Sequence, residues 1–317
     1  MSGVASEAGA RLIVILGPTA SGKSALGLSL ADCLGGEILV CDSTQVYRHF
    51  DIGTGKVPSA EQRGIPHHLI DLVEPHEVFT AGEYRRRALD VLKEVRQRGK
   101  LPIITAGTGL YLRALLEGLA DAPERSEELR ERLRKKAKLH GPGHLHRVLA
   151  RMDREAARQI APGDTQKIIR AIEIRNLAGK PVGEIHRGGR KGLEGYHVTK
   201  IGLQPARDAL YAKINARVEA MIAGGWLEEV RALVTRGVPA DAKPFQFIGY
   251  SVLRACLENG QAAKENAVKQ IQQATRQFSK RQVTWFRKEK GVNWLPGFGD
   301  DPEFISTALQ IARPRHT

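Results

Sequence analysis

The chain has 317 residues, 42% of them hydrophobic, which is enough for one large domain with an insertion or for two domains. Its formal net charge of +14 and its pI of about 9.9 indicate a polyanionic partner. The three cysteines, Cys33, Cys41 and Cys256, have no paired spacing, which excludes a disulfide framework and a zinc site. The sequence has no leader pattern and no apolar run of 18 residues, so we expect a cytoplasmic protein with no membrane span.

The first predicted strand, residues 11–16, runs into a phosphate-binding loop. Residues 17–24 fit the pattern Gly-x4-Gly-Lys-Ser/Thr with no mismatch, and residues 25–30 after them read as helix. Backbone N–H groups of such a loop bind phosphate oxygens, the ammonium of Lys23 adds positive charge, and the hydroxyl of Ser24 suits Mg²⁺. The expected phosphate-binding residues are Gly17, Pro18, Thr19, Ala20, Ser21, Gly22, Lys23 and Ser24.

Two further apolar runs, residues 37–41 and 100–106, read as strands, and residues 80–98 between them read as helix. This alternation predicts an α/β fold of the P-loop NTPase type, in which a parallel sheet is flanked by helices. Ligands of such sheets bind beyond the carboxyl ends of the strands, so the phosphate loop, Asp42 and residues 106–109 should line one crevice. Asp42 could hold magnesium, act as a general base or cap a turn, and the pattern alone does not choose.

In the middle of the chain the strand pattern gives way to charged helical segments, and glycines between residues 188 and 195 form a flexible return. Residues 196–203 then read as a strand that rejoins the sheet. We therefore expect a catalytic core, residues 1–120 and 198–317, with an all-helical insertion domain, residues 121–197. The predicted helices cover residues 126–140, 143–151, 153–160 and 164–178 in the insertion and residues 206–223, 226–236, 247–258 and 262–288 after it.

The positive charge is concentrated in two stretches. Residues 121–197 hold 18 Lys and Arg against 11 Asp and Glu, and residues 262–290 hold 8 against 2. On a wheel of the last long helix, four basic residues fall near one line and four apolar residues fall opposite. A face of nearly one sign favours a nucleic-acid partner over a merely solvated surface. The basic residues are Lys269, Arg276, Lys280 and Arg287, and the apolar ones are Ile271, Ala274, Phe278 and Trp285.

Several longer segments resemble one family closely. The phosphate loop is followed by Asp-Ser-Thr-Gln-Val-Tyr-Arg from residue 42 and by Asp-Ile-Gly-Thr-Gly-Lys from residue 51, and Gly-Asp-Thr-Gln-Lys-Ile-Ile-Arg begins at residue 163. A long match, Thr-Arg-Gln-Phe-Ser-Lys-Arg-Gln-Val-Thr-Trp-Phe-Arg, begins at residue 275. In this combination and order the chain resembles the tRNA dimethylallyltransferases, also called tRNA isopentenyltransferases. No Cys/His finger follows the core, which favours the bacterial type. Shorter matches lie at residues 66–71, 107–112 and 248–250.

The resemblance implies a reaction in which a dimethylallyl group passes from dimethylallyl diphosphate to N6 of the adenosine on the 3′ side of the anticodon, and diphosphate leaves. It implies Asp42 as the general base for the N6 proton, Thr19 near the leaving oxygen and Arg217 on the diphosphate. Mg²⁺ beside Lys23 and Ser24 would offset the charge of the leaving group. The target adenine would be flipped out of the anticodon loop to reach the site.

The resemblance also implies contacts with the tRNA anticodon stem-loop, and we expect the protein to be a monomer. Thr44 stands where many relatives have arginine, and Lys167 keeps the charge of the usual arginine without its bidentate geometry. The basic helix near the C-terminus suits the phosphate backbone. The expected tRNA-binding residues are Asp42, Ser43, Thr44, Gln45, Thr108, Arg130, Gln166, Lys167, Ile168, Ile169, Arg170, Gln246, Phe247, Ile248, Gly249, Tyr250, Ser251, Arg276 and Lys280.

Three other functions stay open at this point. The phosphate loop alone favours an ATP-dependent kinase, since a nucleoside triphosphate and a prenyl diphosphate present the same oxygens. That function leaves the helical insertion and both basic stretches unexplained. A prenyltransferase of free adenine nucleotides needs no RNA-binding surface, and a non-catalytic RNA-binding protein gives Lys23 and Asp42 no task.

Overall fold

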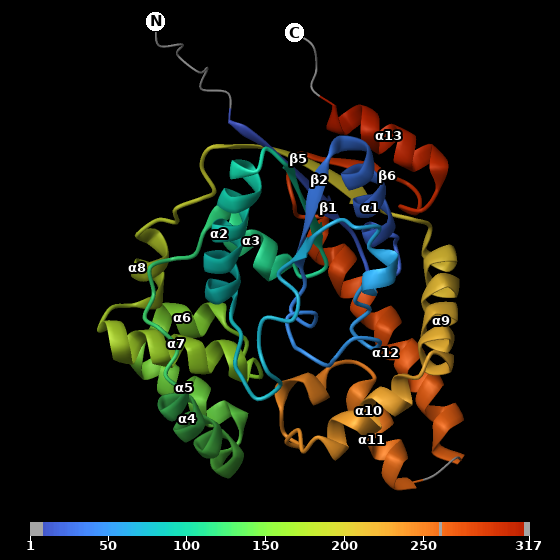
Figure 1. Cartoon of the computed structure of the whole chain (residues 1–317). Helices are drawn as coiled ribbons and strands as arrows, with labels where there is room; N and C mark the ends of the chain where they lie inside the picture. The colour runs from blue at the N-terminus through green and yellow to red at the C-terminus, as the bar shows by residue number, and fades with distance from the viewer. Residues whose placement is uncertain (1–8, 260–261, 314–317) are drawn as a thin grey trace, which may run out of the picture. The chain divides into compact units, whose positions relative to one another are not determined.

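The structure is a computed structural model that describes residues 9–259 and 262–313 (Figure 1). The chain divides into two compact units. We call Met1–Leu115 with Glu194–Thr317 the sheet unit and Leu116–Leu193 the helical unit. Among the described residues, no helix combines the length and the hydropathy that crossing a membrane requires.

The sheet unit is built on six parallel strands in the order β3-β2-β4-β1-β5-β6, which confirms the predicted α/β fold. Leu12 to Leu16 of the central strand β1 are buried, as a continuous apolar run predicts for a strand covered on both faces. The sequence does not predict β3 or β6, because they are too short to show a periodic pattern. The strands are β1 (Ala10–Leu16), β2 (Gly36–Cys41), β3 (His67–His68), β4 (Leu101–Ala106), β5 (Tyr196–Leu203) and β6 (Val292–Leu295).

Helices cover both faces of the sheet (Figure 1). Helices α1 and α13 pack against each other on one face, and α2 and α3 lie on the other. Leu26 and Leu30 of α1 enter the same apolar core as Ile15 and Ile38 of the sheet. The helix α2 starts where predicted, because the side chain of Thr80 accepts a hydrogen bond from the backbone N–H of Glu83. The bounds are α1 (Lys23–Leu34), α2 (Ala81–Gln97), α3 (Gly109–Glu117) and α13 (Pro302–Ala312).

Four more helices of the sheet unit, α9 to α12, pack on one another beyond the carboxyl ends of the strands (Figure 1). The helix α11 begins three residues later than predicted. A 3₁₀ turn over Lys243–Gln246 precedes it, Phe247 is extended, and Gly249 has φ +90°, so no helix can form until residue 250. The bounds are α9 (Arg207–Ala223), α10 (Trp226–Thr235), α11 (Tyr250–Asn259) and α12 (Ala262–Phe286).

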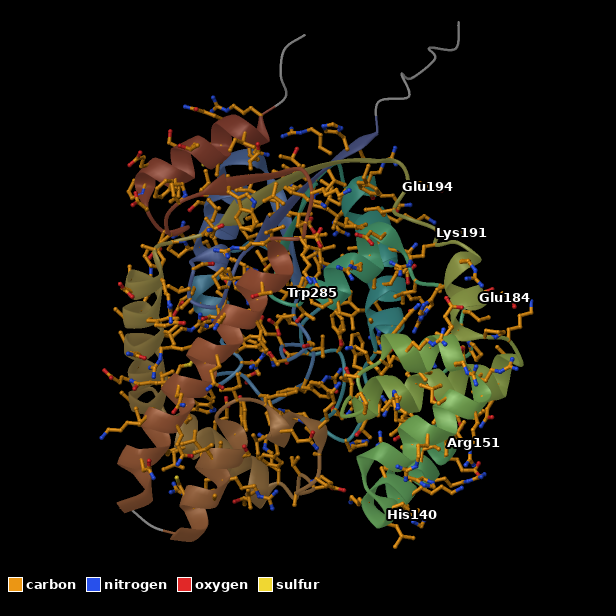
Figure 2. All side chains as sticks on the ribbon, turned by 180° about the vertical axis from the view of Figure 1, so that it is seen from behind. His140, Arg151, Glu184, Lys191, Glu194 and Trp285 are labelled. Atoms are coloured by element: carbon orange, nitrogen blue, oxygen red, sulfur yellow. The ribbon has the colours of Figure 1, made fainter. Side chains whose placement is uncertain are left out.

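The long helix α12 differs in detail from the wheel prediction. Its buried line carries two polar residues, Ser279 and Gln282, beside Ile271 and Phe286. Trp285, labelled in Figure 2, is half-buried with the guanidinium of Arg113 4.7 Å from the ring centroid. Lys269, Lys280 and Arg287 are exposed as predicted, whereas Arg276 is half-buried, and its Nη1 donates to Asn215 Oδ1 at 2.6 Å.

The helical unit contains five helices, four of which are predicted. Three of them begin with a side-chain cap: Ser126 accepts from Leu129 N–H, Asp153 from Ala156 N–H and Asp164 from Lys167 N–H. The sequence misses α8, a short helix that starts after Pro181 and ends just before the glycines expected to form a flexible return. Leu145, Leu149, Ile168 and Ile172 belong to the core of this unit. The bounds are α4 (Glu127–His140), α5 (Pro142–Met152), α6 (Arg154–Gln159), α7 (Thr165–Ala178) and α8 (Val182–Arg187).

Candidate active site

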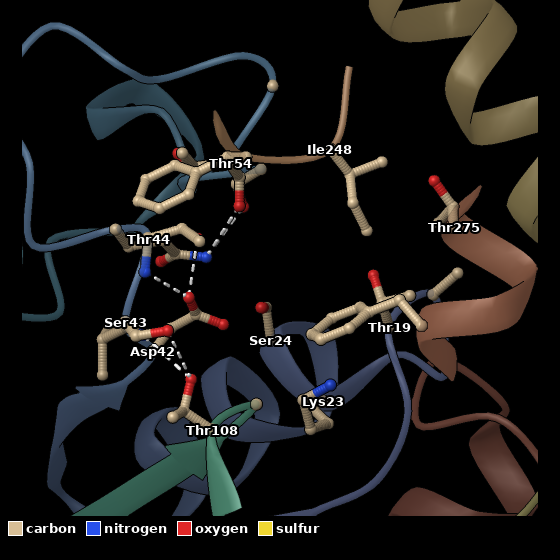
Figure 3. Close-up of a pocket in the computed structure, with 18 of the residues that line it drawn as sticks. Thr19, Lys23, Ser24, Asp42, Ser43, Thr44, Thr54, Thr108, Ile248 and Thr275 are labelled. Carbon is tan, nitrogen blue, oxygen red and sulfur yellow. Dashed lines mark hydrogen bonds between the residues drawn. The ribbon is translucent and has the colours of Figure 1, made fainter. Parts of the chain in front are cut away.

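A cavity of about 400 Å³ opens at the carboxyl ends of β1, β2 and β4, inside the sheet unit (Figure 3). It gathers residues that are far apart in the sequence, as the predicted crevice requires. The predicted site residues that line it are Thr19, Ala20, Lys23, Ser24, Asp42, Ser43, Thr44, Gln45, Thr108, Arg217, Gln246, Phe247 and Ile248.

The phosphate loop joins β1 to α1 at one wall of this cavity. Its second glycine, Gly22, has φ +89°, and a Cβ atom there would lie 2.6 Å from the backbone nitrogen of Gly299. Only glycine fits this position. The N–H of Gly299 donates to the carbonyl oxygen of Ser21 at 2.9 Å, so the turn after β6 holds the loop in place. Because no side chain caps α1, its first N–H groups are left for an anion.

Lys23 and Arg217 are two of the three Lys and Arg side chains that line the same cavity, the third being Arg281. Burial lowers the pKa of Lys23 to about 8, although Asp42 opposes the shift, and Arg217 lowers the pKa further. Burial also lowers the pKa of Arg217 against the attraction of Asp42. The Lys23 ammonium donates to the carbonyl oxygen of Pro18 at 2.8 Å. A bound anion would relieve the cost of holding both charges there, so the pair fits a diphosphate.

Asp42 presents its two carboxylate oxygens to different surroundings. The N–H and the hydroxyl of Thr44 donate to Oδ1, at 2.8 and 2.7 Å. Oδ2 lies against Gly107, where a Cβ atom would be only 2.4 Å from it. The turn interpretation of Asp42 is therefore correct for Oδ1, while Oδ2 accepts no hydrogen bond from the described residues. The carboxylate is fixed in orientation with one oxygen left for a proton.

Three more polar side chains surround Asp42 (Figure 3). The hydroxyl of Thr108 accepts from Ser43 N–H at 2.9 Å and lies 3.2 Å from the Ser43 hydroxyl. The amide nitrogen of Gln45 donates to the carbonyl oxygens of Thr54 and Gly55, at 3.1 and 3.4 Å. Its amide oxygen accepts no hydrogen bond within the part of the chain that the structure describes. These contacts order the strand-end turns around the carboxylate.

The residue before Asp42 is turned the other way. Cys41 ends β2, and successive side chains of a strand point to opposite faces. It is buried on the side of Tyr84 from α2. Its Sγ donates to the carbonyl oxygen of Thr108 at 3.7 Å. Burial raises the pKa of its thiol to about 12, although the neighbouring Tyr84 hydroxyl opposes the shift.

The predicted segment Gln246 to Ser251 divides between the cavity, the interior and, at Ser251, the exposed surface. Gln246, Phe247 and Ile248 line the cavity, whereas Gly249 and Tyr250 are buried. The Tyr250 hydroxyl donates to Glu229 at 2.7 Å, and the same carboxylate accepts from the backbone N–H groups of residues 51 and 52. Tyr250 thus acts here as internal support for the cavity wall.

The site's fit to Mg²⁺ depends on few protein ligands. No group of three or more His, Cys, Asp or Glu that could hold a metal occurs in residues 9–259 and 262–313. The exposed hydroxyl of Ser24 points into the space between Asp42 and Lys23 (Figure 3). One hydroxyl suits Mg²⁺ that takes its other ligands from water and from substrate oxygens, as this ion usually does.

The predicted tRNA contacts in the helical unit have mixed surroundings. Gln166 and Lys167 are exposed, and Ile168 and Ile169 are buried in the core of the unit. Arg130 is 9% exposed, and its Nε and Nη2 each donate to buried Glu173 at 2.8 Å. Folding thus commits the side chains of Arg130, Ile168 and Ile169 to the interior of the unit, and their contact with tRNA stays a prediction.

Arg170 also departs from the expectation of a free contact residue. Its Nη1 donates to Glu173 at 2.5 Å, and its Nη2 donates to the carbonyl oxygen of Pro123 at 3.0 Å. The side chain remains about one-third exposed, at 34%. The exposed part of Arg170 can contact a partner while its hydrogen bonds to Glu173 and Pro123 remain in place.

Sequence reasoning missed Gln282 at the site, and it assigned Arg217 to the site only through the family resemblance. Gln282 lies inside α12, and its amide oxygen accepts from Thr19 N–H at 2.8 Å. Its amide nitrogen donates to the carbonyl oxygen of Gly107, also at 2.8 Å. A glutamine within a basic helix looks like a solvated residue in the sequence. The sequence signal that could have identified Gln282 is its position four residues before Phe286, which places both residues on the buried side of the helical wheel.

Comparison with known proteins gives the family. The profile described as IPP transferase matches residues 45–289. The chain belongs to this family. It is 50% identical over 306 residues to a tRNA dimethylallyltransferase of Koribacter versatilis, covering 95% of this chain and 98% of the relative.

Solved structures of the family agree with the observed fold. A tRNA delta(2)-isopentenylpyrophosphate transferase of Staphylococcus epidermidis superposes with a TM-score of 0.66 at 37% identity, covering 95% of this chain and 96% of that one. A eukaryotic dimethylallyltransferase, described as acting on tRNA, superposes with a TM-score of 0.79 at 25% identity. In that pair 97% of this chain and 81% of the other are covered. The chain is thus a member of a family of transferases.

Proposed function

We propose that this chain transfers a dimethylallyl group from dimethylallyl diphosphate to N6 of the adenosine adjacent to the anticodon in tRNA, with release of diphosphate. The observation that carries the proposal is one cavity in which a phosphate loop, two cations and an oriented carboxylate meet an apolar wall. Phe247, Ile248 and Phe278 belong to that wall. A prenyl diphosphate needs both kinds of surface at once, one for its charge and one for its hydrocarbon.

The cationic side of the cavity would hold the leaving group. Lys23, Arg217 and the N–H groups at the start of α1 would bind the diphosphate oxygens. Thr19 would lie near the bridging oxygen on which charge develops as the carbon–oxygen bond breaks. Mg²⁺, bound through the Ser24 hydroxyl and the diphosphate, would neutralise part of that charge.

Asp42 would take the proton from the attacking amine. The exocyclic N6 of adenine is a poor nucleophile because its lone pair is conjugated with the ring. Removal of its proton during attack helps, and Oδ2 is the oxygen that Thr44 leaves unoccupied. The carboxylate would also stabilise positive charge on the allylic carbon. Ser43 and Gln45 would meet the edges of the flipped base.

The tRNA would be held by basic surface in both units. Lys280 is exposed on α12, and Arg276 lies one turn away. In the helical unit, exposed Gln166 and Lys167 stand at the start of α7. Phosphate contacts of this kind set affinity and register without reading sequence. We further propose that the enzyme acts as a monomer in the cytoplasm.

A direct assay tests the function. The protein, Mg²⁺ and dimethylallyl diphosphate labelled in the prenyl group are incubated with unmodified tRNA, with free AMP or with ATP and no tRNA. We expect label in tRNA, located by nucleoside mass spectrometry at the adenosine 3′ of the anticodon. Label in AMP but not in tRNA would replace the proposal with a nucleotide prenyltransferase. Hydrolysis or transfer of the ATP γ-phosphate without prenyl transfer would replace it with a kinase.

A further inference from the structure

One glutamine side chain links the two halves of the cavity. Gln282 is 6% exposed in the middle of α12. Its amide oxygen accepts from Thr19 N–H in the phosphate loop, and its amide nitrogen donates to Gly107 O after β4. Both bonds are 2.8 Å long. Only this orientation of the amide gives both partners a hydrogen bond. In the reverse orientation the amide NH₂ would face the N–H of Thr19, and the amide oxygen would face the carbonyl oxygen of Gly107.

The two partners of Gln282 stand on either side of the proposed reaction. Thr19 lines the cavity within the loop that would hold the diphosphate. Gly107 packs directly on Oδ2 of Asp42 and cannot carry a side chain there. Its own N–H donates to the carbonyl oxygen of Cys41, the residue before Asp42. The amide of Gln282 therefore fixes the leaving-group loop relative to the carboxylate.

We infer that Gln282 is a positioning residue of the transfer reaction: it holds Thr19 and the Gly107 turn at the separation that in-line attack requires. The expected effect of Gln282 on kcat rests on the proposed function. Gln282 acts through backbone groups and need not touch either substrate. Loss of such a bridge lets two reacting groups drift, and a misplacement of about 1 Å costs on the order of 10²-fold in rate.

The first test replaces the amide with an apolar side chain of similar length, Gln282→Met. We expect kcat to fall by roughly 10- to 100-fold, while KM for dimethylallyl diphosphate and for tRNA changes less than about threefold. The matched control is Gln277→Met, at an exposed glutamine of the same helix, which should keep wild-type kinetics. Wild-type kcat in Gln282→Met would overturn the inference, as would a loss carried wholly by KM.

A second readout does not depend on catalysis. Hydrogen exchange at the Thr19 amide, followed by NMR, should be at least about tenfold faster in Gln282→Met, because its acceptor is gone. Exchange in β1 should stay unchanged. If Thr19 and β1 exchange faster together, the residue only stabilises the fold, and the positioning role is wrong. If the wild type transfers no prenyl group but Thr19 exchange responds as expected, the proposed function fails and the bridge stands.

The variant Gln282→Glu separates the hydrogen bond to Thr19 from the hydrogen bond to Gly107, and it serves as the test if the Met variant folds poorly. It keeps an oxygen for Thr19 N–H and replaces the donor to Gly107 O by another oxygen. We expect near-wild-type exchange at Thr19 together with a reduced kcat, because the turn against Asp42 is released. Since a protonated carboxyl would still donate to Gly107 O, the measurement is made at a pH high enough to ionise the new carboxyl group. Wild-type kcat there would show that the hydrogen bond to Gly107 has no role, and the inference as stated would be wrong.

Discussion

The buried carboxylate of Glu173 gives the strongest stability prediction. Glu173 is 0% exposed in the helical unit, and four hydrogen bonds reach it: one from Ser126 N–H, two from Arg130 and one from Arg170. Burial alone would raise its pKa, but these donors outweigh burial and lower the pKa to about 2. The change Glu173→Gln removes the charge and turns an amide N–H₂ toward guanidinium groups that already donate.

The expected cost is large for a unit of this size. Removing one partner of a buried pair leaves the other charge uncompensated and costs about 3–5 kcal/mol. The total stability of a unit as small as Leu116–Leu193 is roughly 4–12 kcal/mol, at 0.05–0.15 kcal/mol per residue. Glu173→Gln should therefore bring the helical unit close to unfolding under conditions in which the sheet unit stays folded.

Hydrogen exchange resolved by segment measures this effect. We expect amides of α4 and α7 to lose protection in Glu173→Gln, while β1 and β4 keep theirs. The matched control, Glu131→Gln, removes a carboxylate that is 53% exposed and 3.5 Å from Arg134, and it should change stability by less than about 1 kcal/mol. Equal effects of the two variants would refute the reasoning.

The pH dependence of the helical unit follows from the same carboxylate. The folded-state pKa is depressed from 4.5 to about 2, so its stabilising contribution is complete above pH 4.5 and is lost as the pH falls toward 2. Glu173→Gln should lack this acid-dependent loss.

Three further predictions concern the cavity and α12. Asp42→Asn should lower kcat by roughly 10²–10⁴ with little change in tRNA affinity, measured by single turnover and filter binding; equal losses in both would assign Asp42 a folding role. The pKa of Lys23, about 8, predicts that calorimetric affinity for dimethylallyl diphosphate falls as the pH rises above 8, and Lys23→Ala should abolish that dependence; a flat wild-type profile would contradict it. Arg276→Glu with Lys280→Glu should weaken tRNA binding and flatten its salt dependence, and unchanged binding would return α12 to a solvated surface.

The sequence predicts the sheet and its phosphate loop because long apolar runs and a fixed glycine spacing are local signals. It does not predict β3 or β6, since two and four residues show no period and depend on neighbouring strands for pairing. The ranges predicted for α2, α4 and α7 begin at the capping residue of each helix, because a capping side chain bonds within its own turn and so leaves a local signal.

The site is less accessible to sequence reasoning, because its geometry depends on packing between distant elements. Arg217 looks like a solvated helix residue until α9 is packed beside the phosphate loop. Arg130 looks like a free surface charge until Glu173, 43 positions later, is seen to bind it. Gln282 bridges segments 263 and 175 positions away, and no local pattern contains that information.

The neutral, inward-facing thiol of Cys41 has a consequence for the chemistry next to it. An allylic diphosphate is an alkylating agent, and a thiolate beside it would compete with the amine and inactivate the protein by forming a thioether. With a pKa of about 12, the sulfur stays protonated at any physiological pH, and the strand turns it toward Tyr84. The end of β2 thus points the Asp42 carboxylate that follows it toward the cavity and keeps the neighbouring Cys41 thiol protonated on the other face.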